Sequence, residues 1–117
     1  MMRRMLRAKI HRVRITATYL DYEGSLGIAR ELMEASGILP WEEVYVANVT
    51  TGERFTTYAF ETPPKTGVAL YGAAARLGAV DDLAIVMTYA GVDDANAASH
   101  RPVVVRMEDD GITMRGL

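Results

Sequence analysis

A glycine followed by a serine, Gly24-Ser25, is the pair in this sequence with the most distinctive potential chemistry. The Ser25 hydroxyl can attack the carbonyl carbon of Gly24 and convert the peptide bond into an ester. β-Elimination then leaves dehydroalanine at position 25, and hydrolysis releases ammonia and leaves a pyruvoyl group. Gly24 suits this reaction because glycine adopts conformations that other residues avoid. On the dipeptide alone, a loop that ends in a helix N-cap at Ser25 is the better interpretation.

A pyruvoyl group suits the loss of CO2 from an amino acid. This reaction leaves an electron pair on the substrate Cα. The pyruvoyl ketone forms an imine with the substrate amine, and the adjacent amide carbonyl accepts that pair. Pyridoxal phosphate performs the same task through a lysine. The sequence contains only Lys9 and Lys65, and neither comes with a phosphate-binding pattern. A cofactor made from the chain itself would need no nucleotide, metal or pyridoxal site.

Length and composition narrow the class of protein. The 117 residues suffice for one domain, and 50% of them are hydrophobic and 24% charged, as in ordinary globular proteins. The net charge of -2 favours neither nucleic acid nor an anionic membrane as a partner. The lack of cysteine excludes disulfides, thiolate nucleophiles and Cys-based zinc sites, and it fits a cytoplasmic protein. No apolar run approaches the ~18–20 residues that span a bilayer.

The elements that position these residues begin with an N-terminal strand. Six of the 13 basic residues precede the first acidic residue, Asp21. A basic arm of this kind can bind nucleic acid or act as a targeting peptide. Apolar residues alternate with polar ones here, however, which favours a strand over an amphipathic helix. The alternation shifts phase near His11–Arg12, which predicts a bulge, and before it Lys9 and His11 share one face.

The remainder of the chain is predicted to form short strands and few helices. Gly37 is placed to end a helix over 28–35, and Pro40 prevents its continuation. Six or seven short strands favour a β-barrel over an open parallel sheet. The other predicted strands cover 44–49, 54–60, 68–71 and 83–90, a turn or short helix opens at Gly72, and a hairpin joins 102–107 to 112–115.

A series of short segments, taken in order, is far more specific than any one of them. The segments are Met5-Leu6, Lys9-Ile10-His11-Arg12-Val13, Tyr22-Glu23-Gly24-Ser25, Gly37-Ile38-Leu39, Asn48-Val49-Thr50, Arg54-Phe55, Thr57-Tyr58-Ala59 and Gly72-Ala73-Ala74-Ala75. In these segments the chain resembles the pyruvoyl-dependent aspartate 1-decarboxylases over nearly its full length. The resemblance implies a mainly β fold, a six-stranded double-psi β-barrel with short helices, formed by one domain over residues 1–117. It also implies a homotetramer with active sites between neighbouring subunits.

The resemblance assigns roles to individual residues. It implies cleavage between Gly24 and Ser25 and a covalent pyruvoyl cofactor derived from Ser25. Arg54, with Lys9 as a second cation, would bind the substrate carboxylate, and the planar guanidinium suits that bidentate pairing. Tyr58 would return the proton to the carbanion, because a phenol keeps its proton at neutral pH.

Further positions match the surroundings of the family's active site. The hydroxyl of Thr57 corresponds to one that assists processing and lies in the substrate site. Small residues at 72–74 would let main-chain N–H groups approach the ligand. The remaining matches are Gly72, Ala73 and Ala74, which line the pocket, and His11 and Tyr22, which lie near it.

The chain departs from the family at several positions close to this site. It has Ala47 where the family typically has Trp, and Tyr71 where the family typically has Asn. If these two positions share a cavity, the lost indole and the added phenol partly compensate in volume. The loop 61–67 is one residue shorter than usual, and Arg76 stands where many relatives have His.

These features lead to one main hypothesis and two alternatives. The main hypothesis is decarboxylation of L-aspartate to β-alanine and CO2 for pantothenate and coenzyme A synthesis, with a maturation helper protein as a possible partner. One alternative is a paralogue that decarboxylates another acidic amino acid. The other is an unprocessed, non-catalytic barrel that acts as a binding module.

Overall fold

The computed structural model describes residues 1–116, which form seven strands and three short helical segments. The strands are β1 Met2–Tyr19, β2 Leu26–Ala29, β3 Glu43–Asn48, β4 Arg54–Thr62, β5 Val68–Tyr71, β6 Leu83–Asp93 and β7 Val103–Arg106. The helical segments are α1 Arg30–Ser36, the 3₁₀ helix η1 Gly72–Leu77 and α2 Asp94–Ala97. None of these helices is long and apolar enough to cross a membrane.

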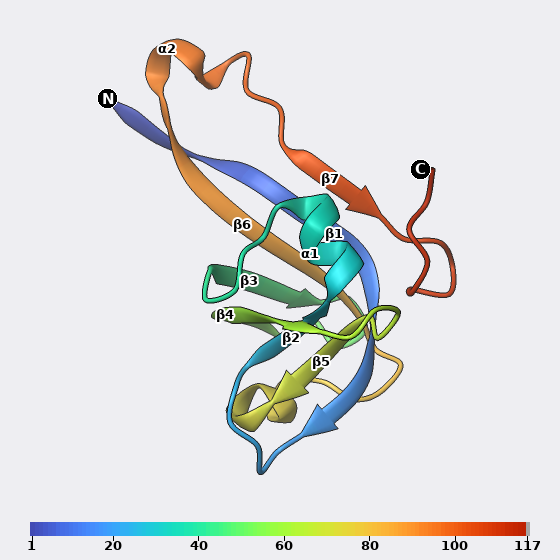
Figure 1. Cartoon of the computed structure of the whole chain (residues 1–117). Coiled ribbons are helices and arrows are strands. Elements are labelled where there is room, and N and C mark those ends of the chain that lie inside the picture. Colours follow the sequence, from blue (N-terminus) through green and yellow to red (C-terminus); the bar gives the residue numbers. More distant parts are fainter. Residues whose placement is uncertain (117) are drawn as a thin grey trace.

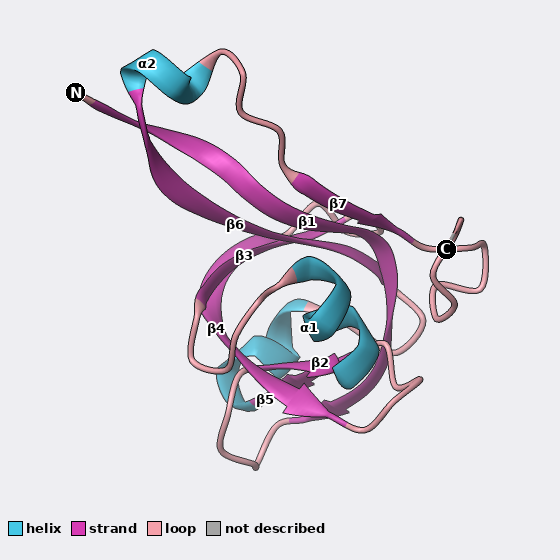
Figure 2. Cartoon of the chain, turned by 45° about the horizontal axis from the view of Figure 1, so that its top comes forward, coloured by secondary structure: helices cyan, strands magenta, loops and turns pink. Residues whose placement is uncertain are grey.

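Six of the strands close into a barrel, which confirms the predicted fold class (Figure 1). The strand order is β5-β2-β4-β3-β6-β1-β7, and an additional pairing of β5 with β1 closes the ring. β7 lies outside the ring, parallel to β1. β1 and β6 continue beyond the barrel as a two-stranded ribbon that leads to α2, and α1 lies over the ring of strands (Figure 2).

β1 takes part in two different regions of the barrel because it bends. Its first part pairs with β6 and β7, and its last part, from Ile15 to Tyr19, pairs with β5. The register against β6 shifts between His11 and Val13, and Arg12 between them has a φ of 68°. A bulge of this kind turns a strand and increases its twist. The predicted phase shift at His11–Arg12 is therefore confirmed.

The barrel interior is filled by side chains that alternate along the strands. The largest fully buried side chains include Ile10, Ile15, Leu26, Ile28 and Leu70. α1 adds Leu32 and Met33 to the same cluster. Each buried aliphatic side chain of this size contributes about 1.5–3 kcal/mol through removal of apolar surface from water.

The predicted helix over 28–35 is wrong at its start. Residues 26–29 form β2, which pairs in parallel with β4 and antiparallel with β5, and α1 begins only at Arg30. All four residues of β2 are buried, and an apolar run this short cannot be distinguished from a buried helical turn by periodicity. Gly37 ends α1 as predicted: its φ is 75°, and its N–H donates to the Met33 carbonyl at 2.8 Å.

Other predicted boundaries shift by a few residues. The predicted strand 68–71 coincides with β5, while β4 and β6 extend beyond 60 and 90. The predicted C-terminal hairpin is reduced to β7 and one isolated bridge between Met107 and Met114. The expected helix N-cap at Ser25 is absent, because Ala29 occupies the cap position of α1 and the side chain of Ser25 is used elsewhere.

The loop between α1 and β3 is anchored by the carboxylate of Glu42. This carboxylate accepts hydrogen bonds from the Arg7 guanidinium at 2.9 Å, the Thr88 hydroxyl at 2.7 Å and the Leu39 N–H at 3.0 Å. Burial raises the pKa of Glu42, but the hydrogen bonds from Leu39, Thr88 and Arg7 and the Arg7 charge together hold this pKa below its ordinary value. The folded chain therefore stabilises the ionised carboxylate.

We expect Glu42→Gln to lower the free energy of unfolding by about 1–3 kcal/mol at pH 7, because a charge-assisted network is lost. A lowered folded pKa contributes stability that is complete above the ordinary value of 4.5 and disappears as the pH falls through the folded value. The difference from the unmodified chain should therefore shrink below pH 4.5. Urea unfolding at several pH values measures it, with exposed Glu34→Gln as the control. An equal loss at every pH would contradict this account.

Candidate active site

The side chain of Ser25 is fixed between neighbouring strands at the start of β2. Ser25 is only 7% exposed, and its Oγ forms a hydrogen bond with the Oγ1 of Thr57 on β4. Its carbonyl accepts a hydrogen bond from the N–H of Tyr71, at the end of β5, at 2.8 Å. Because β2 lies between β4 and β5, both contacts follow from the strand pairing. The structure thus brings together Ser25 and Thr57, as predicted.

The peptide bond before Ser25 has the backbone geometry that glycine permits. Gly24 has a φ of 117°, a value that residues with side chains rarely adopt, and a Cβ here would lie 3.0 Å from a ring carbon of Phe60. The main chain at Gly72 lies close by, since a Cβ on that residue would be 3.3 Å from the Gly24 carbonyl oxygen. Of the other predicted lining residues, Ala73 is exposed and the side chain of Ala74 packs into the core.

Aromatic rings surround this peptide bond. The ring of Tyr71 lies 4.8 Å from that of Phe60 and 4.8 Å from that of Tyr19, which in turn lies 5.6 Å from the ring of Tyr22. Burial, with a smaller contribution from Tyr19, raises the pKa of Tyr71. The phenol that replaces the family's typical Asn is therefore neutral at physiological pH and adds an aromatic wall beside Gly24.

Tyr58 lies at a pocket of about 370 Å³ beside the same peptide bond. The pocket is lined by Glu23, Gly24, Trp41, Tyr58 and Phe60. Gly24 and Tyr58 were predicted from the sequence to belong to the site, whereas Trp41 and Phe60 were not. Phe60 follows from the alternation of β4, on which it shares a face with Tyr58. Trp41 lies in a loop after Pro40, and no spacing in the sequence indicates its position.

A second group of predicted residues lies on the outer face of the barrel, in one row across the strands. His11 pairs with Ile85, Ile85 with Ala47, and Ala47 with Arg54. Neighbouring strands are about 4.8 Å apart, so the row from His11 to Arg54 spans roughly 14 Å. Lys9 lies one row further along the same face, opposite Met87.

This outer face carries an excess of positive charge. On β7, Arg106 continues the row beyond His11, so the two rows contain Lys9, His11, Arg54 and Arg106 and no acidic residue. Within residues 1–116, Lys9 and Arg54 form no ion pair with another side chain. The face is therefore suited to a carboxylate.

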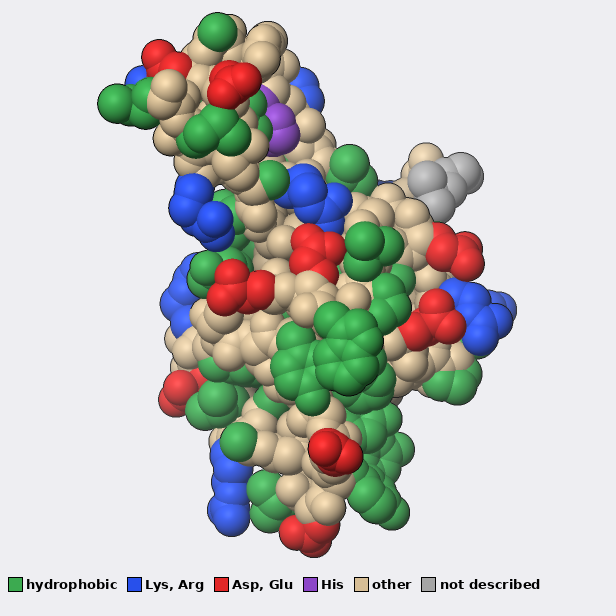
Figure 3. Space-filling view, turned by 60° about the vertical axis from the view of Figure 1, so that its left-hand side comes forward, with side chains coloured by type: hydrophobic (Ala, Val, Ile, Leu, Met, Phe, Trp, Pro, Cys, Tyr) green, Lys and Arg blue, Asp and Glu red, His purple; other side chains and the backbone are tan. Residues whose placement is uncertain are grey.

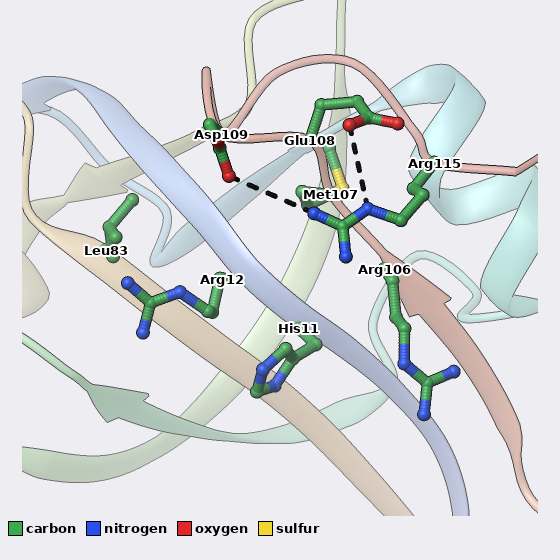
Figure 4. A pocket seen from close by; sticks show the side chains of 8 residues that line it. All are labelled: His11, Arg12, Leu83, Arg106, Met107, Glu108, Asp109 and Arg115. Carbon is green, nitrogen blue, oxygen red and sulfur yellow. Dashed lines mark ion pairs between the residues drawn. The ribbon is translucent and has the colours of Figure 1, made fainter.

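His11 also lines a pocket of about 250 Å³ at the edge of this face (Figure 4). Arg115 in the same pocket forms ion pairs with Glu108 at 3.6 Å and Asp109 at 3.9 Å. The Nδ1 of His11 is buried and has no hydrogen-bond partner among the described residues. Burial, and then the positive charges of Lys9 and nearby arginines, lowers the pKa of His11, so the imidazole is neutral at pH 7.

Within one chain the two groups remain apart. Arg54 and Thr57 are three residues apart on β4, about 10 Å, and alternation directs them to opposite faces. The interior side of β4 is identified by Phe55, which packs against the core, and by fully buried Ala59. A single chain therefore does not bring Arg54 and Lys9 against Ser25.

The suggested compensation between Ala47 and Tyr71 finds no support within one chain. Ala47 pairs with Arg54 at the start of β4, whereas the ring of Tyr71 contacts Phe60 near its end. Six residues of strand separate these two partners, roughly 20 Å. Within one chain the two side chains therefore do not share a cavity.

Comparisons with known proteins agree with the resemblance. The family model described as Aspartate decarboxylase matches residues 1–113. A protein of Syntrophobacter fumaroxidans named aspartate 1-decarboxylase is 52% identical over 94% of this chain and 90% of its own length. Proteins of the same name are 49% identical in Desulfotalea psychrophila, over 94% of this chain and 93% of the relative, and in Caulobacter vibrioides, over 92% of both.

These matches extend over the barrel strands, the Gly24-Ser25 pair and the outer face that carries Arg54. At such identity and coverage, the chain belongs to the aspartate decarboxylase family.

Proposed function

We propose that this chain is an aspartate 1-decarboxylase that converts L-aspartate to β-alanine and CO2, a step that supplies pantothenate synthesis. The observation that carries the proposal is the setting of Ser25, which is buried, hydrogen-bonded to Thr57 and preceded by Gly24 with a φ of 117°. A nucleophile held beside a peptide bond of this geometry fits self-cleavage. The names of the relatives support aspartate as the substrate.

In this proposal the chain first cleaves itself between Gly24 and Ser25. The Oγ of Ser25 attacks the Gly24 carbonyl carbon, and the C–N bond breaks to give an ester and a free amine. Thr57, already bonded to that Oγ, orients the hydroxyl for the attack. Elimination then breaks the Cβ–Oγ bond and releases the Gly24 carboxylate. Hydrolysis with loss of ammonia leaves a pyruvoyl group at position 25.

The residues around position 25 fit this cofactor. A Cβ at Gly72 would lie 3.3 Å from the carbonyl oxygens of both Gly24 and Tyr22, so a glycine at this position keeps the main chain close to the peptide bond that is cleaved. When present, the pyruvoyl group supplies an electron sink for the pair that decarboxylation leaves on the substrate. Arg54 and Lys9 bind and orient the acid through charge-assisted hydrogen bonds. Tyr58 donates its phenolic proton to the substrate Cα.

The separation of Arg54 and Lys9 from Ser25 favours an active site shared between subunits. One chain would supply the cleavage cluster and Tyr58, and a neighbouring chain would supply the basic outer face. This arrangement supports the homotetramer implied by the family, with a complete site at each such contact. The burial of Ser25 is compatible with a helper protein that promotes maturation. Attack by a buried hydroxyl depends on small rearrangements of the loop before β2, and such a helper would promote them.

We expect a purified, warmed preparation to contain two fragments, one ending at Gly24 and one beginning at position 25. Intact mass identifies them, and hydroxylamine or hydride trapping should label only the longer fragment. Release of CO2 from aspartate, glutamate and methylated aspartates then tests the substrate, since Ala47, where the family typically has Trp, pairs with Arg54. A persistently full-length chain without turnover would instead support a non-catalytic barrel. A preference for glutamate or a methylated aspartate would identify a paralogue.

A further inference from the structure

Trp41 lies against Tyr58 at the pocket beside the Gly24–Ser25 peptide bond. The ring centroids are 5.5 Å apart, with an interplanar angle of 21°, so the indole and the phenol are stacked. Trp41 is 78% exposed, and Leu39 of the same loop is 65% exposed. This loop is on the side of the molecule turned forward in Figure 3, which shows apolar side chains grouped among charged ones.

The backbone at Trp41 is unusual for so large a residue. Its φ is 74°, in the left-handed region, which a bulky side chain rarely enters without compensation. Such outliers are retained where the surrounding structure fixes them, and they occur frequently at functional sites. The conformation turns the indole toward β4 and over the phenol.

The surroundings hold this conformation firmly. The N–H of Trp41 donates to the Ala59 carbonyl at 2.8 Å, and the N–H of Ala59 donates to the Glu42 carbonyl at 3.0 Å. The carboxylate of Glu42 is bound by Arg7 and Thr88. The loop is thus attached on both sides of Trp41 to the barrel that carries Tyr58. An exposed apolar ring with a strained, well-anchored backbone is not explained by core packing.

We propose that Trp41 is a positioning residue for Tyr58, whose stacked indole holds the phenol in the orientation from which it donates its proton. This inference rests on the proposed function. A proton donor must lie within hydrogen-bond reach of the atom it protonates. The phenol of Tyr58 is half-buried on a strand face, and one stacked neighbour limits its rotation. Trp41 acts through Tyr58 and takes no part in binding the acid.

Three replacements separate stacking from other effects of the side chain. Trp41→Phe keeps an aromatic ring, Trp41→Leu keeps apolar volume, and Trp41→Ala removes both. All three have a Cβ, so the backbone strain at a φ of 74° is the same. Loss of the stack should lower kcat by about 10- to 100-fold, since a misplacement near 1 Å costs about that much. KM should change little in all three variants, and Trp41→Phe should retain most of the kcat of the unmodified chain. Leu39→Ala in the same loop is the matched control and should leave both constants unchanged.

A second measurement needs no turnover, because Trp41 is the only tryptophan in the sequence. In the unprocessed Ser25→Ala chain, time-resolved fluorescence anisotropy reports the local motion of this one indole. Tyr58→Leu should increase the amplitude of fast indole motion, whereas Tyr58→Phe, which keeps a ring to stack on, should not.

The outcomes are distinguishable. Lowered kcat in Trp41→Ala and Trp41→Leu, recovery in Trp41→Phe and a selective anisotropy change in Tyr58→Leu support the positioning role. Normal turnover with equal kcat in Trp41→Ala and Trp41→Phe would overturn it, as would equal anisotropy in the two Tyr58 variants. Absence of turnover in the unmodified chain would overturn the proposed function itself.

Discussion

A Ser25→Ala chain is expected to stay at its full length of 117 residues, with no cleavage after prolonged warming and no turnover. Alanine lacks the only atom that can attack the Gly24 carbonyl from within the same residue. The substitution removes one hydrogen bond, to Thr57, and no core contact, so the loss in stability should be about 1–2 kcal/mol. Intact mass and hydroxylamine labelling measure cleavage and cofactor, and circular dichroism measures the fold.

Ser36→Ala is the matched control for this variant. Ser36 is 1% exposed and its Oγ takes part in hydrogen bonds with the Met33 carbonyl and the Ile38 N–H, so the same atom is removed from an equally buried position. This control should cleave normally. The assignment of the cofactor to Ser25 would be refuted if the Ser25→Ala chain retained turnover. It would also be refuted if hydroxylamine trapped a ketone in the uncleaved Ser25→Ala chain.

The barrel could be anticipated from the sequence because its strands carry strong local signals. These signals depend only on residues that are close together in the sequence. Examples are the alternation in β1, its phase shift at Arg12 and the extent of the strand 68–71. β2 was misassigned because its four residues are all buried, and its strand conformation depends on pairing with β4 and β5, which come from distant parts of the chain. Local periodicity contains no information about such pairing.

The sequence named several residues of the candidate site, but it indicated neither Trp41 and Phe60 nor the arrangement of the site. The contact of Ser25 with Thr57 depends on the parallel pairing of β2 with β4, which links residues 32 positions apart. The row that joins His11 to Arg54 depends on four strands in register. The stacking of Trp41 on Tyr58 depends on a left-handed backbone angle in a loop. The resemblance to the family supplied the hypothesis about the chemistry, whereas the division of these residues between two faces follows only from the topology.

The division of the site residues between two faces of the barrel leads to a specific prediction for Arg54. Replacement of Arg54 by alanine should lower kcat/KM for aspartate by about 100- to 1,000-fold, because two charge-assisted hydrogen bonds to a carboxylate are lost. Most of the loss should be in KM, since binding of the acid is removed from ground state and transition state alike. Cleavage at Gly24 should proceed normally, because the proposed attack uses the Ser25 hydroxyl, oriented by Thr57, and needs no cation to bind a substrate carboxylate.

The appropriate control is Arg30→Ala, which removes an exposed guanidinium paired with Glu61 at 3.1 Å and lies outside both groups of site residues. It should leave kcat/KM and cleavage unchanged. Arg54→Lys should recover only part of the binding, because an ammonium lacks the planar fork. If Arg54→Ala slowed cleavage as much as it weakened binding, Arg54 would take part in self-processing and its assignment to substrate binding alone would be wrong. If KM for aspartate were unaffected, the acid would be bound elsewhere. Selective loss of binding therefore tests whether the basic face, and not the cleavage cluster, recognises the carboxylate.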